Sequence, residues 1–223
     1  MPVRKLLHDL VALLSICGIL ALTSAPATAL QTPVFPGGGG SEPDLMDVLD
    51  NLYGLGNLQR VDDLDDQVWW NINGGALAKA KYAGYALDFG YIDSNGFNFL
   101  FSTPPNWQGE LIGYEGETPD HLELPSFRWG IYTSAGDTWS SLMSENSDSY
   151  DHMVTWKVIG EDNTFVVAWE DLYSLGDGDY QDLIVEVNNC ACAIPDASAL
   201  VLLGSAMIGV GVFGRKKVFK KKV

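Results

Sequence analysis

Bulky apolar residues recur at every second position through residues 84–187. This spacing places the bulky side chains of each segment on one face of a β-strand. Clusters of turn-forming residues, such as those at 93–96, 103–106 and 176–178, separate the segments. The alternating sets are Phe97, Phe99 and Phe101; Phe127, Trp129 and Ile131; Val154, Trp156 and Val158; Phe165, Val167 and Trp169; and Leu183, Val185 and Val187. Short alternating strands with few helical signals predict a mainly β fold, an antiparallel β-sandwich of jelly-roll-like form.

The pattern also suggests where the domain begins and ends. We expect the β-sandwich over residues 81–193 and a short helix with a connecting segment over 44–80. The helix is predicted because apolar residues have helical spacing there, namely Leu45, Val48, Leu49, Leu52 and Leu55. Residues 30–43 are rich in Pro and Gly and are predicted to be a linker that buries no surface.

The first 29 residues have the features of a secretory signal peptide. Arg4 and Lys5 precede an apolar run over residues 10–22, and Ala27, Thr28 and Ala29 are the small residues that a signal peptidase requires. Cleavage by signal peptidase would leave Leu30 as the first residue. The protein is therefore expected to be exported.

The last 30 residues, 194–223, have three parts. A short motif that contains Pro195, Asp196, Ala197 and Ser198 precedes an apolar stretch over residues 199–213, and a basic tail follows. The apolar stretch is short for a membrane span, which needs about 20 residues, although bilayer thinning accommodates shorter ones. This stretch contains several glycines, which are common in membrane helices but destabilise helices of soluble proteins. These residues predict one C-terminal transmembrane helix with the basic tail in the cytoplasm.

This three-part end resembles the PEP-CTERM sorting signal of exported bacterial proteins. The family carries a Pro-Glu-Pro motif, a membrane helix and an Arg/Lys cluster, whereas Asp196 stands here in place of Glu and the second Pro is missing. The resemblance implies recognition by an exosortase-like sorting enzyme. It also implies an inner-membrane intermediate held by the helix, followed by release or attachment at the cell surface.

The charge of the central region excludes one class of partner. Between Leu30 and Pro195 the chain has five basic residues and 27 acidic ones. Binding to phosphates requires clustered Lys and Arg, so a nucleic-acid partner is excluded. Seven tryptophans suggest sugar contacts instead. Three of them alternate with the strand pattern and are expected in the core, which leaves Trp69, Trp70, Trp107 and Trp139 as candidates for a contact surface.

One acidic cluster has a pattern that suggests a metal. Glu170 and Asp171 end a predicted strand, and Asp177, Asp179 and Asp182 precede the next one. Like charges this close destabilise a compact turn unless a cation neutralises them. Ca²⁺, which prefers carboxylate and carbonyl oxygens, is the expected cofactor. The spacing is not that of an EF-hand, and a solvated acidic turn is the alternative.

Other reactive residues give weaker signals. Cys190 and Cys192 are a pair that would form a small disulfide or bond between molecules. His121 and His152 have no metal-binding spacing and no nucleophile motif beside them, and a lone His is usually structural. With so many carboxylates, the pair that a glycosidase needs remains an open alternative that no particular residues favour.

The acidic cluster and its surroundings resemble a β-sandwich domain of unknown function found in bacterial surface and PEP-CTERM proteins. The resemblance rests on Trp169, Glu170 and Asp171, on 178–180 and on 182–185, and it extends over most of residues 81–187. It implies calcium binding at Asp177, Asp179 and Asp182, and it implies no enzymatic activity.

These observations favour a non-catalytic exported protein of a Gram-negative bacterium, a surface or extracellular-matrix component made rigid by Ca²⁺. A Ca²⁺-dependent carbohydrate-binding module, with exopolysaccharide as a possible partner, is the alternative. That alternative requires exposed aromatic residues beside the acidic cluster. A secreted hydrolase is the third hypothesis.

Overall fold

The computed structural model describes residues 31–36, 42–70, 74–117 and 126–192. The chain divides into two units, residues 1–30 and 31–223, and every described element belongs to the second. The predicted signal peptide and the predicted sorting signal at 194–223, with Pro195 to Ser198 and the apolar stretch, lie outside the described residues. Within the described part of the chain, no helix has the length and apolar character needed to cross a membrane.

The described chain is mainly β, with one short α-helix. Two 3₁₀ turns, η1 (Met143–Glu145) and η2 (Tyr173–Leu175), interrupt the loops. In chain order the other elements are α2 (Leu45–Tyr53), β1 (Leu58–Arg60), β2 (Trp69–Trp70), β3 (Gly75–Ala83), β4 (Leu87–Asp93), β5 (Gly96–Thr103), β6 (Trp107–Glu110), β7 (Glu115–Glu117), β8 (Arg128–Thr133), β9 (Thr138–Ser140), β10 (Met153–Val158), β11 (Phe165–Trp169), β12 (Leu183–Val187) and β13 (Ala191–Cys192).

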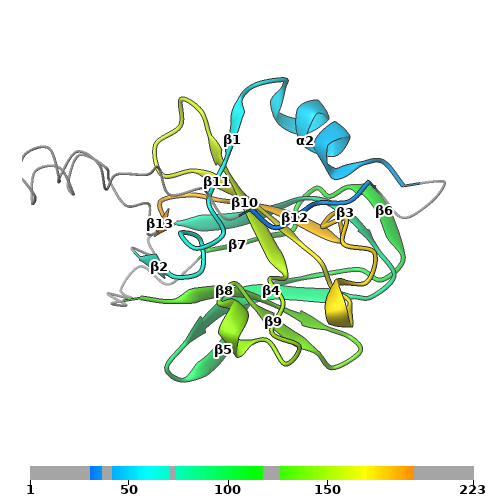
Figure 1. The fold of residues 1–223 in the computed structure, drawn as a ribbon, viewed down its shortest axis with the longest axis vertical. Helices are drawn as coiled ribbons and strands as arrows, with labels where there is room; N and C mark the ends of the chain where they lie inside the picture. The colour runs from blue at the N-terminus through cyan, green and yellow to red at the C-terminus, as the bar shows by residue number, and fades with distance from the viewer. Residues whose placement is uncertain (1–30, 37–41, 71–73, 118–125, 193–223) are drawn as a thin grey trace, which may run out of the picture. The chain divides into compact units, whose positions relative to one another are not determined.

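The strands form two main sheets, and every pairing in them is antiparallel, as the sequence predicts. The larger sheet has the order β1-β10-β11-β12-β3-β6, and β7 also pairs with β3. The smaller sheet has the order β5-β4-β8-β9, and β13 pairs with β2 in a separate short ribbon. Figure 1 shows the smaller sheet on one side of the larger one and α2 on the other. The arrangement is β-sandwich-like.

An aromatic core fills the space between the two sheets. Phe89 stacks on Trp129 with ring centroids 5.3 Å apart, and Phe127 meets Trp129 edge to face at 4.9 Å. Trp69 and Trp139, which the sequence offers as surface candidates, are fully buried. Both indoles find main-chain acceptors inside the protein, the carbonyls of Asp66 and Asp171. A turn-flanking Trp is therefore compatible with the core where its N–H has a buried partner.

A second apolar cluster lies on the outer face of the larger sheet, under α2. The helix buries Leu45, Val48 and Leu49, and Gly54, which follows its last residue, caps it with a φ of 84°. Strand β11 is buried on both faces, because Val166 and Ala168 join this cluster while its other residues join the inner core. This double burial explains the continuous apolar run of the strand.

A β-bulge changes the face on which two predicted core residues lie. Phe101 pairs with Phe89, but Phe99 pairs with Gly90, so Leu100 is an extra residue in β5. Phe101 points into the core, whereas Phe99 is 58% exposed. The strict period of two therefore fails in this strand, and Phe97 and Phe99 lie outside the inner core.

The larger sheet also recruits residues before the predicted start at residue 81. Strand β3 begins at Gly75 and pairs with β12, and β1 pairs with β10. Part of the predicted linker contacts the domain as well. The N–H of Phe35 donates to the carbonyl of Gly178 at 2.9 Å, and Val34 packs against the outer cluster.

Candidate functional site

The five predicted metal ligands lie in one loop, which we call the acidic loop and define as residues 170–182. It joins β11 to β12, which form an antiparallel hairpin with Trp169 opposite Leu183. This pairing brings the two ends of the loop together. Glu170 and Asp171 at its start therefore lie beside Asp182 at its end.

The backbone of the acidic loop is tightly coiled. Ser174, Leu175 and Tyr180 have positive φ angles of 57°, 62° and 58°, and Gly176 and Gly178 have φ of 41° and 70°. A left-handed conformation costs a residue with a side chain roughly 1–2 kcal/mol. Three such residues in one loop indicate local strain, which persists only where other contacts hold the loop in place.

Carboxylates from both ends of the loop converge. Glu170, Asp177 and Asp179 offer oxygens that all lie within 4.8 Å of one another, and so do Glu170, Asp171 and Asp182. Glu170 is common to both groups. It is fully buried, and Asp171 and Asp179 are 3% and 2% exposed, whereas Asp177 faces solvent.

Main-chain donors fix the central carboxylate. The two oxygens of Glu170 accept hydrogen bonds from the N–H groups of Leu172 at 3.2 Å and Gly178 at 3.1 Å. The N–H of Asp171 donates to Asp182 Oδ2 at 2.8 Å. Each carboxylate oxygen has a second lone pair, so these bonds leave it able to bind a cation.

Burial and mutual repulsion raise the pKa values of the cluster. Burial raises the pKa of Glu170 to about 8, and the charges of Asp177 and Asp179 add to that rise. Burial also raises the pKa of Asp171 to about 6, against the opposing charge of Lys81. The pKa of Asp182 is raised well above its usual range, first by burial and then by the charge of Asp171. Ionising all of these carboxylates would therefore place more negative charge on the loop than its surroundings neutralise.

Lys81 supplies a positive charge to one side of the cluster. Its side chain is fully buried on β3, and its ammonium group donates to the carbonyls of Ala83, Tyr85 and Pro104 at 3.1, 2.6 and 3.0 Å. Burial lowers the pKa of Lys81, while Asp171 and Asp182 raise it. Sequence patterns do not point to Lys81, because it lies about 90 positions before the carboxylates that it faces.

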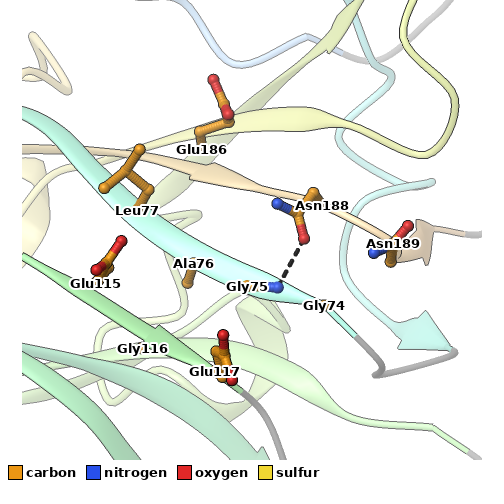
Figure 2. Close-up of a pocket in the computed structure, with 10 residues that line it drawn as sticks. All are labelled: Gly74, Gly75, Ala76, Leu77, Glu115, Gly116, Glu117, Glu186, Asn188 and Asn189. Atoms are coloured by element: carbon orange, nitrogen blue, oxygen red, sulfur yellow. Dashed lines mark hydrogen bonds between the residues drawn. The ribbon is translucent and has the colours of Figure 1, made fainter.

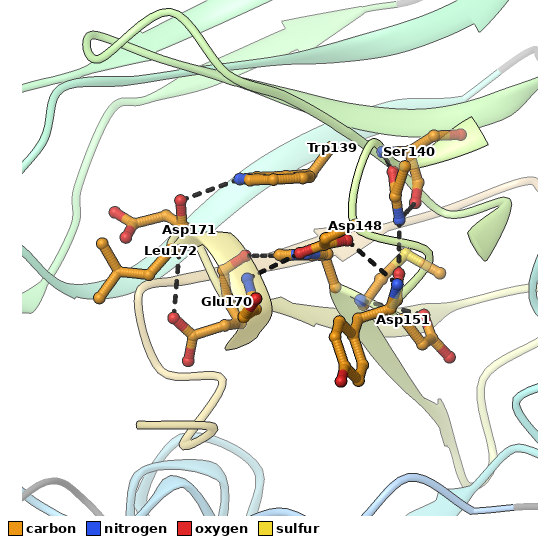
Figure 3. Close-up of polar contacts among 12 residues, drawn as sticks. Trp139, Ser140, Asp148, Asp151, Glu170, Asp171 and Leu172 are labelled. Atoms are coloured by element: carbon orange, nitrogen blue, oxygen red, sulfur yellow. Dashed lines mark hydrogen bonds and ion pairs between the residues drawn. The ribbon is translucent and has the colours of Figure 1, made fainter. Parts of the chain in front are cut away.

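A buried histidine, His152, contacts the start of the acidic loop. Figure 3 shows Asp148 and Trp139 near Glu170 and Asp171 at this end of the loop. Nδ1 of His152 faces the carbonyl of Glu170 at 2.8 Å, and Nε2 faces Asp148 Oδ2 at 2.9 Å. The ring stacks on Trp139 with centroids 3.8 Å apart, and Trp139 Nε1 donates to the carbonyl of Asp171 at 2.9 Å. Because both ring nitrogens face acceptor oxygens, His152 is the hydrogen-bonded structural residue that the sequence predicts.

Asp148 joins this histidine to the loop. Its Oδ2 also accepts the N–H of Ser174 at 2.7 Å. Although burial raises the pKa of Asp148, hydrogen bonds from Tyr150, His152 and Ser174 hold it below the usual range. Sequence reasoning did not select Asp148, and only its spacing of four residues from His152 would have pointed to it.

The donor set suits a hard divalent cation. Asp171 Oδ2 and Gln181 Oε1 are buried oxygens without a hydrogen-bond partner. Buried oxygens in that state cost free energy unless a proton or a cation satisfies them. Several carboxylates and an amide oxygen on a short loop are the ligands that Ca²⁺ prefers. The residues present therefore fit this ion.

The remaining predicted site residues lie elsewhere. Cys190 and Cys192 are buried free thiols, and burial raises the pKa of each to about 12. Thiols with such pKa values are poor nucleophiles and poor metal ligands at neutral pH. His121 lies outside the described residues.

A separate pocket of about 600 Å³ lies beside strands β3 and β7. Figure 2 shows its side chains, with Asn188 Oδ1 accepting the N–H of Gly75 at 2.6 Å. Glu115, Glu117 and Glu186 contribute three carboxylates to the lining, and no residue of the acidic loop contributes to it. Its negative charge is unsuited to anionic ligands.

Comparison with known proteins finds similarity over part of the chain. No curated protein matches it significantly. The structure of the Chromobacterium violaceum lectin CV2L, in complex with α-methyl-fucoside, is similar at 16% identity. The match covers 55% of this chain and 95% of the lectin, with a TM-score of 0.35. Residues 95–189, which include the acidic loop, match a family model described as Domain of unknown function (DUF4114).

Proposed function

We propose that this chain is a non-catalytic exported protein of the cell surface or extracellular matrix, stabilised by Ca²⁺ bound in the acidic loop. The observation that carries the proposal is that two groups of three carboxylates, which share Glu170, lie on one strained loop, with three of the five carboxylates almost completely buried. The whole domain has five basic residues. A bound divalent cation would offset both the repulsion and the strain.

Within the cluster, charge favours one of the two carboxylate groups. Lys81 acts on Asp171 and Asp182, so that side of the loop already has a counter-charge. Glu170, Asp177 and Asp179 form the other group, and Asp177 faces solvent. An exposed ligand allows water to complete the six to eight oxygens that Ca²⁺ takes. We assign the ion to the group formed by Glu170, Asp177 and Asp179.

The export route rests on the sequence of the two ends. A signal peptide at residues 1–29 would send the chain out of the cytoplasm, and residues 194–223 would hold it in the inner membrane for an exosortase-like enzyme. The extracellular location agrees with a Ca²⁺ site of modest affinity, because such modules bind with dissociation constants of about 10⁻⁴ to 10⁻³ M.

Thermal melting with and without Ca²⁺ tests the proposal. Metal at ten times its dissociation constant adds roughly 1.4 kcal/mol of stability by linkage. For a domain of this size, that corresponds to a rise in melting temperature of roughly 3–5 °C. Mg²⁺ should do less, because it dehydrates reluctantly. A melting temperature that does not respond to millimolar Ca²⁺ would contradict the proposal and indicate that the acidic loop is a solvated turn without a bound metal ion.

Two variants locate the effect. Asp177→Asn removes an exposed ligand, and Asp179→Asn removes a buried charge; both should weaken the Ca²⁺-induced shift while leaving the metal-free melting temperature unchanged or slightly higher. Glu161→Gln is the matched control, since it removes an exposed charge in the loop between β10 and β11, at the other end of β11. An equal loss of the shift in all three variants would indicate non-specific screening.

One observation favours carbohydrate binding as a second candidate function. Tyr173 in the acidic loop is 60% exposed, and Phe35, whose N–H bonds to the loop at Gly178, is 55% exposed. Exposed aromatic rings beside a cation site are the feature that this alternative requires. Glycan-array binding that needs Ca²⁺ and is lost in Tyr173→Ala would support it. A hydrolase panel on the same protein tests the non-catalytic assignment.

A further inference from the structure

Two exposed tyrosines lie on neighbouring loops. Tyr150, in the segment between η1 and β10, is 49% exposed, and Tyr173, in η2 of the acidic loop, is 60% exposed. Single exposed aromatic residues are common on protein surfaces and need no explanation. A pair of them is significant only where the protein holds both in place.

One carboxylate holds both of these loops. Oδ1 of Asp148 accepts the N–H of Tyr150 at 3.0 Å, and Oδ2 accepts the N–H of Ser174 at 2.7 Å. The side chain of Asp148 is 1% exposed, and its Oδ2 also lies 2.9 Å from Nε2 of the fully buried His152. The main chain of Tyr150 and that of the residue after Tyr173 are therefore bonded to the two oxygens of one fixed group.

The main chain beside each tyrosine is strained. Ser149, directly before Tyr150, has a φ of 62°, and Ser174, directly after Tyr173, has a φ of 57°. A residue with a side chain adopts this left-handed conformation at a cost in free energy, and such residues cluster at ligand-binding sites. Both serines are exposed, so buried packing of their side chains does not explain their conformation. Both loops are therefore held in strained conformations that present an aromatic ring to solvent.

The chain around the two rings is rich in hydroxyl groups, because Ser147, Ser149 and Ser174 are all exposed. A protein interface is built around a continuous apolar centre, which separate rings among serines do not provide. A sugar ring has a face of C–H groups that packs on an aromatic ring, and its rim of hydroxyl groups bonds to serine hydroxyls. This surface therefore favours a carbohydrate over a protein partner.

The charge of the domain favours one kind of carbohydrate. Asp177, four residues after Tyr173, faces solvent, and the region from Leu30 to Pro195 has 27 acidic residues against five basic ones. An anionic polysaccharide would be repelled. We propose that Tyr150 and Tyr173 form an aromatic platform that binds a neutral polysaccharide, a chain in which different sugar units can stack on the two rings.

This proposal names the partner of the carbohydrate-binding candidate given above and rests on that candidate. It does not rest on Ca²⁺, because Asp148 holds the platform and belongs to neither group of converging carboxylates. Binding to the platform should therefore persist in the metal-free protein.

Affinity electrophoresis of the full-length chain tests the proposal. Native gels contain a soluble β-glucan, mannan or galactan as the neutral probe, or alginate as the anionic one, with a chelator throughout. At least one neutral polymer should retard the unmodified protein. Tyr150→Ala and Tyr173→Ala should each raise its dissociation constant about tenfold, because each removes one stacking ring. Tyr132→Ala, which removes a 41% exposed ring from β8, is the matched control and should bind as the unmodified protein does.

Asp148→Asn tests the shared carboxylate as a positioning residue. An amide has one acceptor oxygen, so one of the two loop N–H groups loses its partner while both rings remain. Binding should weaken in Asp148→Asn, whereas Tyr150→Phe and Tyr173→Phe, which keep the rings and leave Asp148 unchanged, should retain most of it.

The platform is overturned if no neutral polymer retards the unmodified protein, or if either Tyr→Ala variant binds as well as the Tyr132→Ala control. Retardation by alginate alone would overturn the assignment to neutral polysaccharides. Retardation that appears only when Ca²⁺ replaces the chelator would also overturn the platform, and would support the Ca²⁺-dependent candidate instead. The gels give their result whether or not the acidic loop binds metal, so failure of the Ca²⁺ site and failure of the platform are distinguishable.

Discussion

Lys81 is a buried residue on which the acidic loop depends although it lies far from it in sequence. Its ammonium group donates hydrogen bonds to three main-chain carbonyls, and its positive charge opposes the negative charges of Asp171 and Asp182. Removing one partner of a buried charge pair leaves the other uncompensated, which costs more than the pair itself contributes. Replacing Lys81 with a neutral residue should therefore strongly destabilise the folded protein.

Lys81→Met should lower the free energy of unfolding by roughly 3 kcal/mol, measured by denaturant titration. Lys79→Met is the control on the same strand, since Lys79 is 25% exposed and lies 3.6 Å from Glu186. A partly exposed pair of this kind contributes roughly 0–1 kcal/mol. Equal losses for the two variants would show that the buried ammonium has no special role.

The pH dependence of stability should reveal Glu170. Its folded-state pKa of about 8 exceeds its ordinary value of 4.5, so the folded protein holds a proton that the unfolded chain releases. Metal-free stability is therefore greatest below about pH 4.5 for this group and falls as the pH rises towards 8. Ca²⁺ needs the ionised carboxylate, so the Ca²⁺-induced shift should grow over the same range. Melting curves in chelator and in Ca²⁺ across this range measure both trends, and Glu170→Gln should flatten the metal-free one.

At the residue scale, the sequence predicted contacts between residues that are close in the chain and missed contacts between residues that are far apart in it. The five loop carboxylates are close because one hairpin carries them, and a hairpin can be predicted from strand periodicity and turn residues. Lys81, His152 and Asp148 come from other strands and loops, and a single sequence does not show which distant residues meet. Trp139 was misplaced for the same reason, since its buried acceptor at Asp171 lies 32 positions away.

At the element scale, strand β4 shows where periodicity stops being informative. Its partner β5 contains the bulge, so the three phenylalanines of β5 do not share a face. A bulge is set by how closely two strands approach, and this approach depends on both of them. A Cβ at Gly90 would lie 2.1 Å from the carbonyl oxygen of Asn98. Gly90 therefore permits the close contact that the period of two does not reveal.

Gly90→Ala should destabilise the domain by roughly 2–3 kcal/mol, because main-chain atoms cannot move aside as a flexible side chain can. Gly84→Ala is the matched control, since a Cβ there meets nothing within 4 Å and the φ angle is not positive. Thermal melting of the two variants compares them. A Gly90→Ala protein as stable as the control would mean that β5 shifts its register without loss.

At the scale of the whole molecule, the apolar core that the structure describes occupies one continuous part of the sequence. Every buried apolar residue that the structure describes lies between Leu45 and Cys192. These residues form the inner aromatic core and the cluster under α2. The fold class could be predicted from this region alone. The sheet order could not, because strand periodicity does not say which strands are neighbours.

Deleting residues 197–223 should leave a soluble domain that melts cooperatively. The sorting interpretation predicts this result, because it assigns the apolar stretch to the membrane and not to the core. Calorimetry of the truncated and full chains makes the comparison. Loss of the cooperative transition on truncation would place the C-terminal stretch in the fold and contradict the sorting interpretation.

The larger sheet joins strands from opposite ends of the domain. Strand β1 pairs with β10, and β3 pairs with β12, so residues near 58 and 76 need partners near 158 and 187. Closing such long loops is slow, because their entropy is lost before the contacts form. A ribosome delivers the chain from its N-terminus, so β3 has no partner in its own sheet until β6, and the centre of the sheet stays open until β12 emerges. The order of synthesis thus delays folding until almost the whole domain has been made, and a late-folding chain of this kind would suit the export that we propose.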